Sequence, residues 1–160
     1  MSPRVHEVNV NLPHPALPDG DWADGFSVVV DQPFDNARSA GDAIIAAFPK
    51  WMSPALFLRK ILVAPFGLKG AIHHNGSDRV GIFPITYEAS DALYAGIDET
   101  HLNFRIVVEI EDHAGGQQVL LKTIIKRHNA LGRYYLRLIM PFHRRIITSA
   151  LAKLNETKLN

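Results

Sequence analysis

The chain has 160 residues, of which 47% are hydrophobic and 21% charged, and its formal net charge is +1 with histidine counted as neutral. These values fit one globular domain and exclude a disordered chain and a strong bulk attraction to nucleic acid. The absence of cysteine excludes disulfides, thiolate zinc sites and a cysteine nucleophile, and it suits a reducing compartment.

Residues 1–24 are expected to form an extended lead-in, because proline and glycine are frequent in residues 12–20. Residues 1–11 lack the apolar core of a secretory signal. The longest apolar stretch, residues 55–66, is interrupted by two basic residues and is too short to span a bilayer. We therefore expect a cytoplasmic protein without stable membrane insertion.

A single domain is expected over residues 25–155, followed by a frayed tail at 156–160. Alternating apolar residues predict a short strand at 26–31. Asp35 or Asn36 can cap a helix that Pro49 ends, and Ser53-Pro54 is a typical start for a second helix.

From residue 81 onward the apolar period changes to about two, which predicts strands at 81–87, 93–97, 102–111 and 119–128. Such strands would form an antiparallel meander with one solvated face. Pro84 favours an edge or a bulge, and Pro84 and Gly96 together are expected to curve the sheet.

Asn129 is expected to cap the longest helix, in which Pro141 should cause a kink but no end, since the apolar periodicity resumes after it. The predicted apolar stripe of this helix comprises Tyr135, Leu136, Ile139, Met140, Phe142, Ile146, Ile147, Ala150, Leu151 and Leu154.

The element order predicts an α+β fold of the helix-grip type. A curved antiparallel sheet would wrap around the long kinked C-terminal helix, with two short helices after the first strand. A fold of this type often leaves a cavity between the sheet and the helix.

Three stretches resemble a bacterial family called domain of unknown function 2867: residues 128–151, residues 96–111 and residues 64–70 (APFGLKG). The most specific part is LGRYY at 131–135, followed by PFHR at 141–144. The resemblance implies a START/Bet v 1-like fold. It also implies relatives that are fused behind atypical short-chain dehydrogenases, although no strand in this chain is followed by GxGxxG.

The candidate ligand-binding residues are aromatic side chains that would line a cavity if the interior is hollow and would pack in the core if it is not. They are Phe83, Tyr87, Tyr94, Phe104, Tyr135 and Phe142. Arg105 and Arg127 are candidates for the polar end of a ligand. Alternatively, Arg105 pairs with Asp98 or Glu109, and Arg127, placed in an apolar register, reaches solvent or an acidic partner.

The eight histidines show no metal-binding spacing, and no metal or other cofactor is predicted. His128 could form an acid/base set with Asp98 or His101. The simpler interpretation is that His128 closes a strand-to-helix junction and that His143 fills a helix position beside Pro141.

Arg133, Arg137, Arg144 and Arg145 make the last helix basic, a pattern that can dock on anionic membranes or nucleic acid. Most such faces are only solvated, and the sequence shows no aromatic residues interleaved on the polar side.

The first functional hypothesis is a domain that binds an apolar or amphipathic small molecule. The second is an accessory module for a separate NAD(P)-dependent oxidoreductase, and the third is an enzyme with a histidine acid/base, although no catalytic constellation is complete. A homodimer is a further partner hypothesis.

Overall fold

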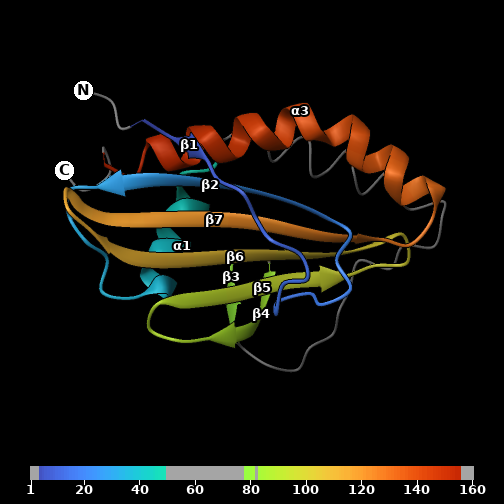
Figure 1. Cartoon of the computed structure of the whole chain (residues 1–160), viewed down its shortest axis with the longest axis horizontal. Helices are drawn as coiled ribbons and strands as arrows, with labels where there is room; N and C mark the ends of the chain where they lie inside the picture. Colours follow the sequence, from blue (N-terminus) through green and yellow to red (C-terminus); the bar gives the residue numbers. More distant parts are fainter. Residues whose placement is uncertain (1–3, 50–77, 82, 156–160) are drawn as a thin grey trace.

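A computed structural model describes residues 4–49, 78–81 and 83–155. Within this part the chain forms a seven-stranded antiparallel sheet in the order β1-β2-β7-β6-β5-β4-β3 (Figure 1). The strands are β1 (His6–Glu7), β2 (Trp22–Val30), β3 (Arg79–Val80), β4 (Phe83–Glu88), β5 (Ala92–Asp98), β6 (Leu102–His113) and β7 (Gly116–Arg127). The described helices are α1 (Ala37–Ala46) and α3 (Ala130–Ala152).

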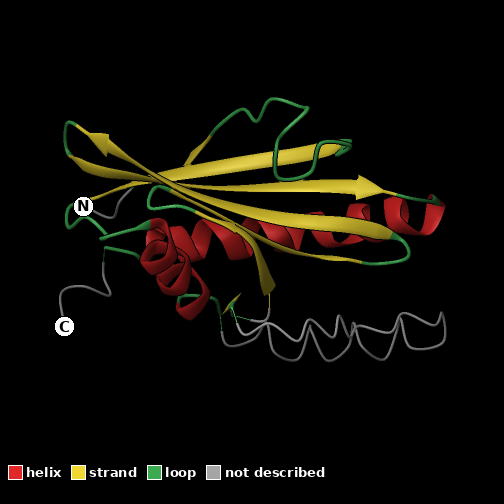
Figure 2. Cartoon of the chain, turned by 90° about the horizontal axis from the view of Figure 1, so that it is seen from below, coloured by secondary structure: helices red, strands yellow, loops and turns green. Residues whose placement is uncertain are grey.

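Both helices lie on the same face of the sheet, and the N-terminal segment crosses the opposite face (Figure 2). The main core forms where α1 and the C-terminal half of α3 meet the helix-facing side of β2, β5, β6 and β7. The predicted α+β class, with a curved antiparallel sheet and a long C-terminal helix, is confirmed.

The meander β4 to β7 follows the alternation of the sequence. In β6, Leu102, Ile106 and Val108 face the helices and are buried. A register shift between Ile85 and Tyr87 places a bulge two residues after Pro84, as expected for a strand containing proline.

The expectation that one face of the meander is solvated was wrong for part of that face. Val107, Ile124 and Leu17 form a second buried apolar cluster on that face, beneath the N-terminal segment. The segment therefore belongs to the folded structure, because it supplies Leu17 and removes apolar surface of β6 and β7 from water.

β2 is longer than predicted and begins at Trp22 because its whole length pairs with β7, from Trp22 opposite Ile125 to Val30 opposite Gln117. Residues with low strand propensity such as Asp24 and Gly25 are held in the strand by this pairing.

Asn36 caps α1, since its side chain accepts a hydrogen bond from the Ser39 backbone N–H at 2.8 Å. α1 ends at Ala46, three residues before Pro49, and buries Ala40 and Ile44 in the core. The second predicted short helix, from Ser53 onward, lies outside the described residues.

α3 begins at the predicted cap, where the Asn129 side chain accepts a hydrogen bond from Gly132 N–H at 3.0 Å, and it runs through Pro141. Leu136, Ile147 and Leu151 form its buried side. The assignment of Phe142 to that side was wrong: its exposed fraction is 56%. Phe142 is six residues after Leu136 and five before Ile147, which at 3.6 residues per turn turns it away from both.

We predict that Gly96→Ala lowers the free energy of unfolding by about 2–4 kcal/mol, because a Cβ at this position would lie 1.9 Å from the backbone oxygen of Phe104. Urea unfolding of both proteins measures the loss. Gly115→Ala is the matched control, since a Cβ there meets no atom closer than 3.9 Å. Equal stability of the two variants would contradict the prediction.

Candidate functional site

A polar cluster lies between the sheet and α3. Asp24 of β2 and Thr123 of β7 are cross-strand neighbours, and both lie in the helix-facing register of their strands. His143 of α3 meets them: its Nε2 is 3.3 Å from Thr123 Oγ1 and 3.3 Å from Asp24 Oδ2. β2, which is distant in sequence, and the consecutive elements β7 and α3 thus bring a carboxylate, a hydroxyl and an imidazole together.

The cluster is largely shielded from water. Thr123 has an exposed fraction of 1%, and the side chains of Asp24 and His143 are 13% and 17% exposed. Burying such groups costs free energy unless they pair with one another. Apolar clusters lie on both sides along α3, one around Leu136 and the other around Ile147.

The geometry of His143 bears on the chemistry available to it. A nucleophile triad needs the two ring nitrogens to engage different partners, one the carboxylate and the other the hydroxyl. Here Asp24 and Thr123 both contact Nε2. Among the described residues, Nδ1 of His143 makes no hydrogen bond. The arrangement therefore suits an oriented imidazole that binds a polar group better than it suits a relay that activates Thr123.

Trp22 connects the polar cluster to a neighbouring apolar cluster. Trp22 contacts the His143 ring edge to face, with ring centroids 6.4 Å apart. Phe104, Tyr135 and Met140 pack around Leu136 on the same side of the sheet. An oriented polar cluster beside aromatic surface is typical of sites that bind small molecules.

Of the predicted ligand-binding aromatics, Phe83, Phe104 and Tyr135 lie on the helix-facing side. The rings of Phe83 and Phe104 pack with centroids 5.4 Å apart. Tyr94 instead packs against the cluster of Val107 and Ile124 on the outer face of the sheet. Tyr87 and Phe142 also lie outside the helix-facing layer. Tyr87 stacks on Tyr94 and is 48% exposed, and Phe142 faces solvent on α3.

Both predicted arginines have protein partners. Arg105 Nη1 is 2.7 Å from Asp98 Oδ1, one of the two pairs proposed from the sequence. Arg127 Nε is 3.1 Å from Asp21 Oδ1, so it reaches an acidic partner. Neither arginine joins the cluster around His143.

The histidine set proposed for acid/base chemistry is divided among separate partners. His128 Nε2 is 2.9 Å from Asn103 Oδ1, and His101 Nδ1 is 3.1 Å from the Asn129 side-chain nitrogen. Asp98 is paired with Arg105. The backbone N–H of His128 also donates to the His101 carbonyl oxygen, which fits the interpretation that His128 closes the strand-to-helix junction.

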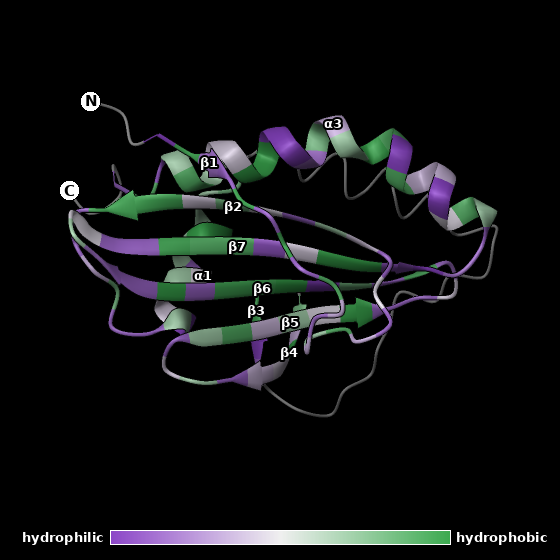
Figure 3. Ribbon diagram, in the orientation of Figure 1, coloured by the Kyte–Doolittle hydropathy of each residue, from purple (hydrophilic) through white to green (hydrophobic). Residues whose placement is uncertain are grey.

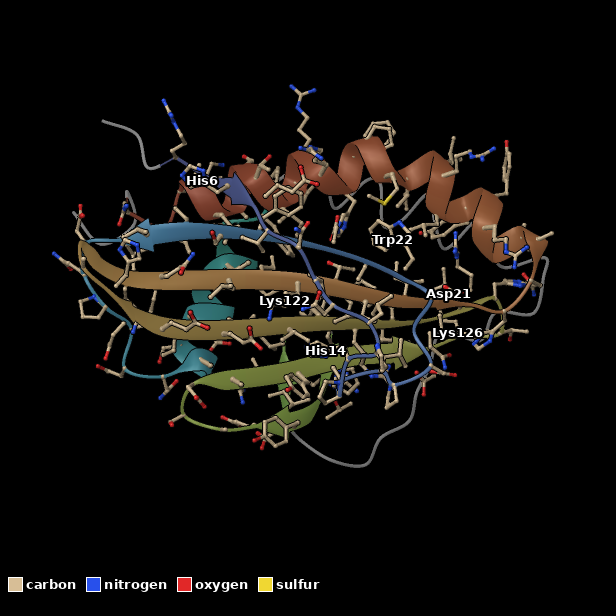
Figure 4. The ribbon with its side chains drawn as sticks, viewed as in Figure 1. His6, His14, Asp21, Trp22, Lys122 and Lys126 are labelled. Atoms are coloured by element: carbon tan, nitrogen blue, oxygen red, sulfur yellow. The ribbon has the colours of Figure 1, made fainter. Side chains whose placement is uncertain are left out.

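A second group of polar side chains lies on the outer face of the sheet. Lys122 of β7 and Glu109 of β6 form an ion pair, and His14 of the N-terminal segment lies near Lys122 (Figure 4). The His14 ring packs on Tyr94 with centroids 5.7 Å apart, and its Nδ1 accepts a hydrogen bond from the Ala16 N–H.

The surroundings of this group shift two pKa values. Burial lowers the pKa of His14, and the charge of Lys122 lowers it further against the opposing effect of Glu109. Burial likewise raises the pKa of Tyr94, with further contributions from Glu109, Tyr87 and Asp91. The neutral forms of His14 and Tyr94 are therefore favoured.

Sequence reasoning missed Asp24 and His14 because both belong to the predicted lead-in. Thr123 lies in the apolar register of β7, and a hydroxyl within that register was the signal available from the sequence. Asp24, two residues before the buried Phe26, gives the same signal once β2 is known to begin at Trp22.

The fold and the site define an α+β domain with an open seven-stranded antiparallel sheet, covered on one face by a long C-terminal helix that contributes to an interlayer polar cluster. The chain belongs to the family described as "Protein of unknown function (DUF2867)", whose sequence model matches residues 16–150. No curated protein and no solved structure matches the chain.

Two further observations concern the described residues only. Neither described helix combines the length and apolar character needed to cross a bilayer. No group of three or more histidine, aspartate or glutamate side chains in this part of the chain is arranged to hold a metal ion.

We predict that the lowered pKa of His14 makes stability depend on pH. The unfolded chain takes up this proton near the ordinary value of 6.5, and the folded protein takes it up only at lower pH. The stability that this difference in His14 pKa gives to the folded protein is thus fully present above pH 6.5. It is lost as the pH falls from there toward the pKa of His14 in the folded protein. His14→Asn keeps an acceptor for the Ala16 N–H and removes the titration.

Chemical denaturation of wild type and His14→Asn at about pH 7 and about pH 5 measures the free energy of unfolding. The difference between the two proteins separates the contribution of His14 from that of the other histidines. Wild type should lose more free energy of unfolding than His14→Asn. Parallel pH profiles would show that His14 makes no such contribution.

Proposed function

We propose that this domain binds an amphipathic small molecule between the sheet and α3. The observation that carries the proposal is the cluster of Asp24, Thr123 and His143, a shielded polar group within an otherwise apolar layer. The apolar part of the ligand would pack against Phe104 and Trp22, where burial of carbon surface supplies most of the binding free energy.

The polar part of the ligand would meet the imidazole of His143. Asp24 accepts a hydrogen bond from Nε2, which fixes the orientation of the ring and leaves Nδ1 for a ligand group. A hydroxyl suits this position because it donates to a neutral imidazole and accepts from a protonated one. We therefore favour a hydroxyl-bearing ligand.

The helix-grip assignment predicted from the sequence belongs to this proposal. A long helix across one face of a curved antiparallel sheet supports it, and proteins of this type often bind ligands in that layer. Fold alone does not establish function, so the argument depends on the polar cluster. Partnership with a separate oxidoreductase stays a prediction from the family resemblance.

The first test is native mass spectrometry of the protein purified from its own host, where a bound molecule would add a defined mass. The second is equilibrium dialysis with 2-naphthol and naphthalene, which differ only by a hydroxyl. We expect wild type to bind 2-naphthol about 2–10 times more tightly than naphthalene, the range of one hydrogen bond.

His143→Leu should abolish this preference while leaving naphthalene binding within about twofold, because only the polar contact is lost. His128→Leu, the same change at an exposed histidine paired with Asn103, should keep the preference. Thermal unfolding verifies that both variants are folded. A ligand-free native mass together with no binding of either probe would refute the proposal.

A further inference from the structure

The solvent-facing side of α3 carries a row of large apolar side chains. Tyr134, Leu138 and Phe142 have exposed fractions of 67%, 58% and 56%. Their spacing of four residues places them one above the other on the helix surface. Contiguous exposed apolar surface of this kind on a protein typically marks an interaction site.

A second row, of basic side chains, runs parallel to the first. Arg133, Arg137 and Arg145 are exposed and are separated by multiples of four residues. Pro141 occupies the position between Arg137 and Arg145 in this row. Figure 3 shows hydrophilic and hydrophobic stretches alternating along α3. Because α3 contains no aspartate or glutamate, this surface has a single sign of charge.

Neither row belongs to the apolar clusters of the described residues. The buried side of α3 is formed by other residues, among them Leu136 and Ile147. Arg144, the fourth arginine of the helix, is bound to Glu7 at 2.8 Å and lies over the Phe26 ring, whereas no ion pair is formed by the three arginines of the basic row within the described part of the chain. The expectation that aromatic residues do not interleave with the arginines was wrong, since Tyr134 and Phe142 are exposed beside them.

We propose that the outer side of α3 docks the domain on a membrane surface that carries anionic lipid headgroups. Tyr134, Leu138 and Phe142 would enter the boundary between headgroups and acyl chains. The guanidinium groups of Arg133, Arg137 and Arg145 would bind lipid phosphates and carboxylates, which their planar donor geometry matches. The domain would bind at the membrane surface, and α3 would not cross the bilayer.

The charge and shape of the outer side of α3 favour a membrane surface over other partners. A second copy paired through α3 would set one arginine row against another, with no acidic residue on either helix to compensate. A deep protein groove needs most of a helix's circumference, but one side of α3 is already packed on the sheet. A planar lipid surface requires only the exposed strip. A nucleic acid would leave the apolar row without a partner.

The docking surface is separate from the proposed ligand site. His143 points to the sheet, while Phe142 faces solvent. The two proposals therefore stand or fall independently, and a protein that binds vesicles but no small molecule would support only this one.

Vesicle co-sedimentation of the full chain tests the proposal, with phosphatidylcholine vesicles that contain or lack about 30% phosphatidylserine. We expect binding to the anionic vesicles only, and its loss at about 0.5 M salt. Arg137→Gln with Arg145→Gln should weaken binding roughly 25-fold, from about fivefold for each arginine. Arg4→Gln with Arg79→Gln, an equal change of charge at exposed positions elsewhere, should weaken it less than about twofold.

Leu138→Ser with Phe142→Ser should weaken binding at least about tenfold through loss of apolar burial, and these exposed positions allow the fold to persist. Unchanged binding of this variant would overturn the proposal, because basic charge alone would then explain the attraction. Absence of vesicle binding, or a stable dimer in sedimentation velocity that the same two substitutions disrupt, would also overturn it.

Discussion

The close approach of the start of α3 to the turn between β5 and β6 fixes how this helix lies on the sheet. A Cβ at Gly132 would be 2.2 Å from the backbone oxygen of His101, so only glycine allows this contact. Asn129 closes the same junction by capping the helix and contacting His101. Once the first turn is fixed here, rotation of the helix about its axis is also fixed, and with it the side of α3 on which every later residue lies.

That rotation assigns two different roles to two sides of one helix. His143 is directed to Asp24 and Thr123 in the interlayer, and Tyr134 and Leu138 are directed to water. The neighbours His143 and Phe142 therefore lie in opposite environments. A change in helix register of one residue would bury Phe142 and expose the imidazole, so the packing decides the roles of these two neighbours.

The opposite face of the sheet is stabilised in a different way. The N-terminal segment places Leu17 on Val107 and Ile124, and His14 lies beside Tyr94 and Lys122. Gly25 makes room for this segment where it passes along β2, since a Cβ there would lie 2.8 Å from the Val10 side chain. Apolar surface of the sheet is thus buried on both faces, by helices on one side and by the irregular N-terminal segment with Leu17 and His14 on the other.

The sequence by itself determined the α+β class, the meander, the cap at Asn129 and the continuation of α3 through Pro141, and it narrowed the cap of α1 to Asp35 or Asn36. These features depend on local periodicity and on single side chains that satisfy nearby backbone groups. Pairing of Arg105 with Asp98 was also predictable, because both flank one tight turn.

Only the tertiary structure decided which residues share a site. Asp24 and His143 are 119 residues apart in sequence, and their meeting depends on β2 pairing with β7 and on the rotation of α3. Likewise, an apolar stripe wider than one helix face can be buried only in part, and the sequence pattern does not say which edge stays in water. Packing against the sheet decides both which residues share the site and which edge of the stripe stays exposed. The amphipathic pattern alone only indicates the approximate side of the helix that is buried.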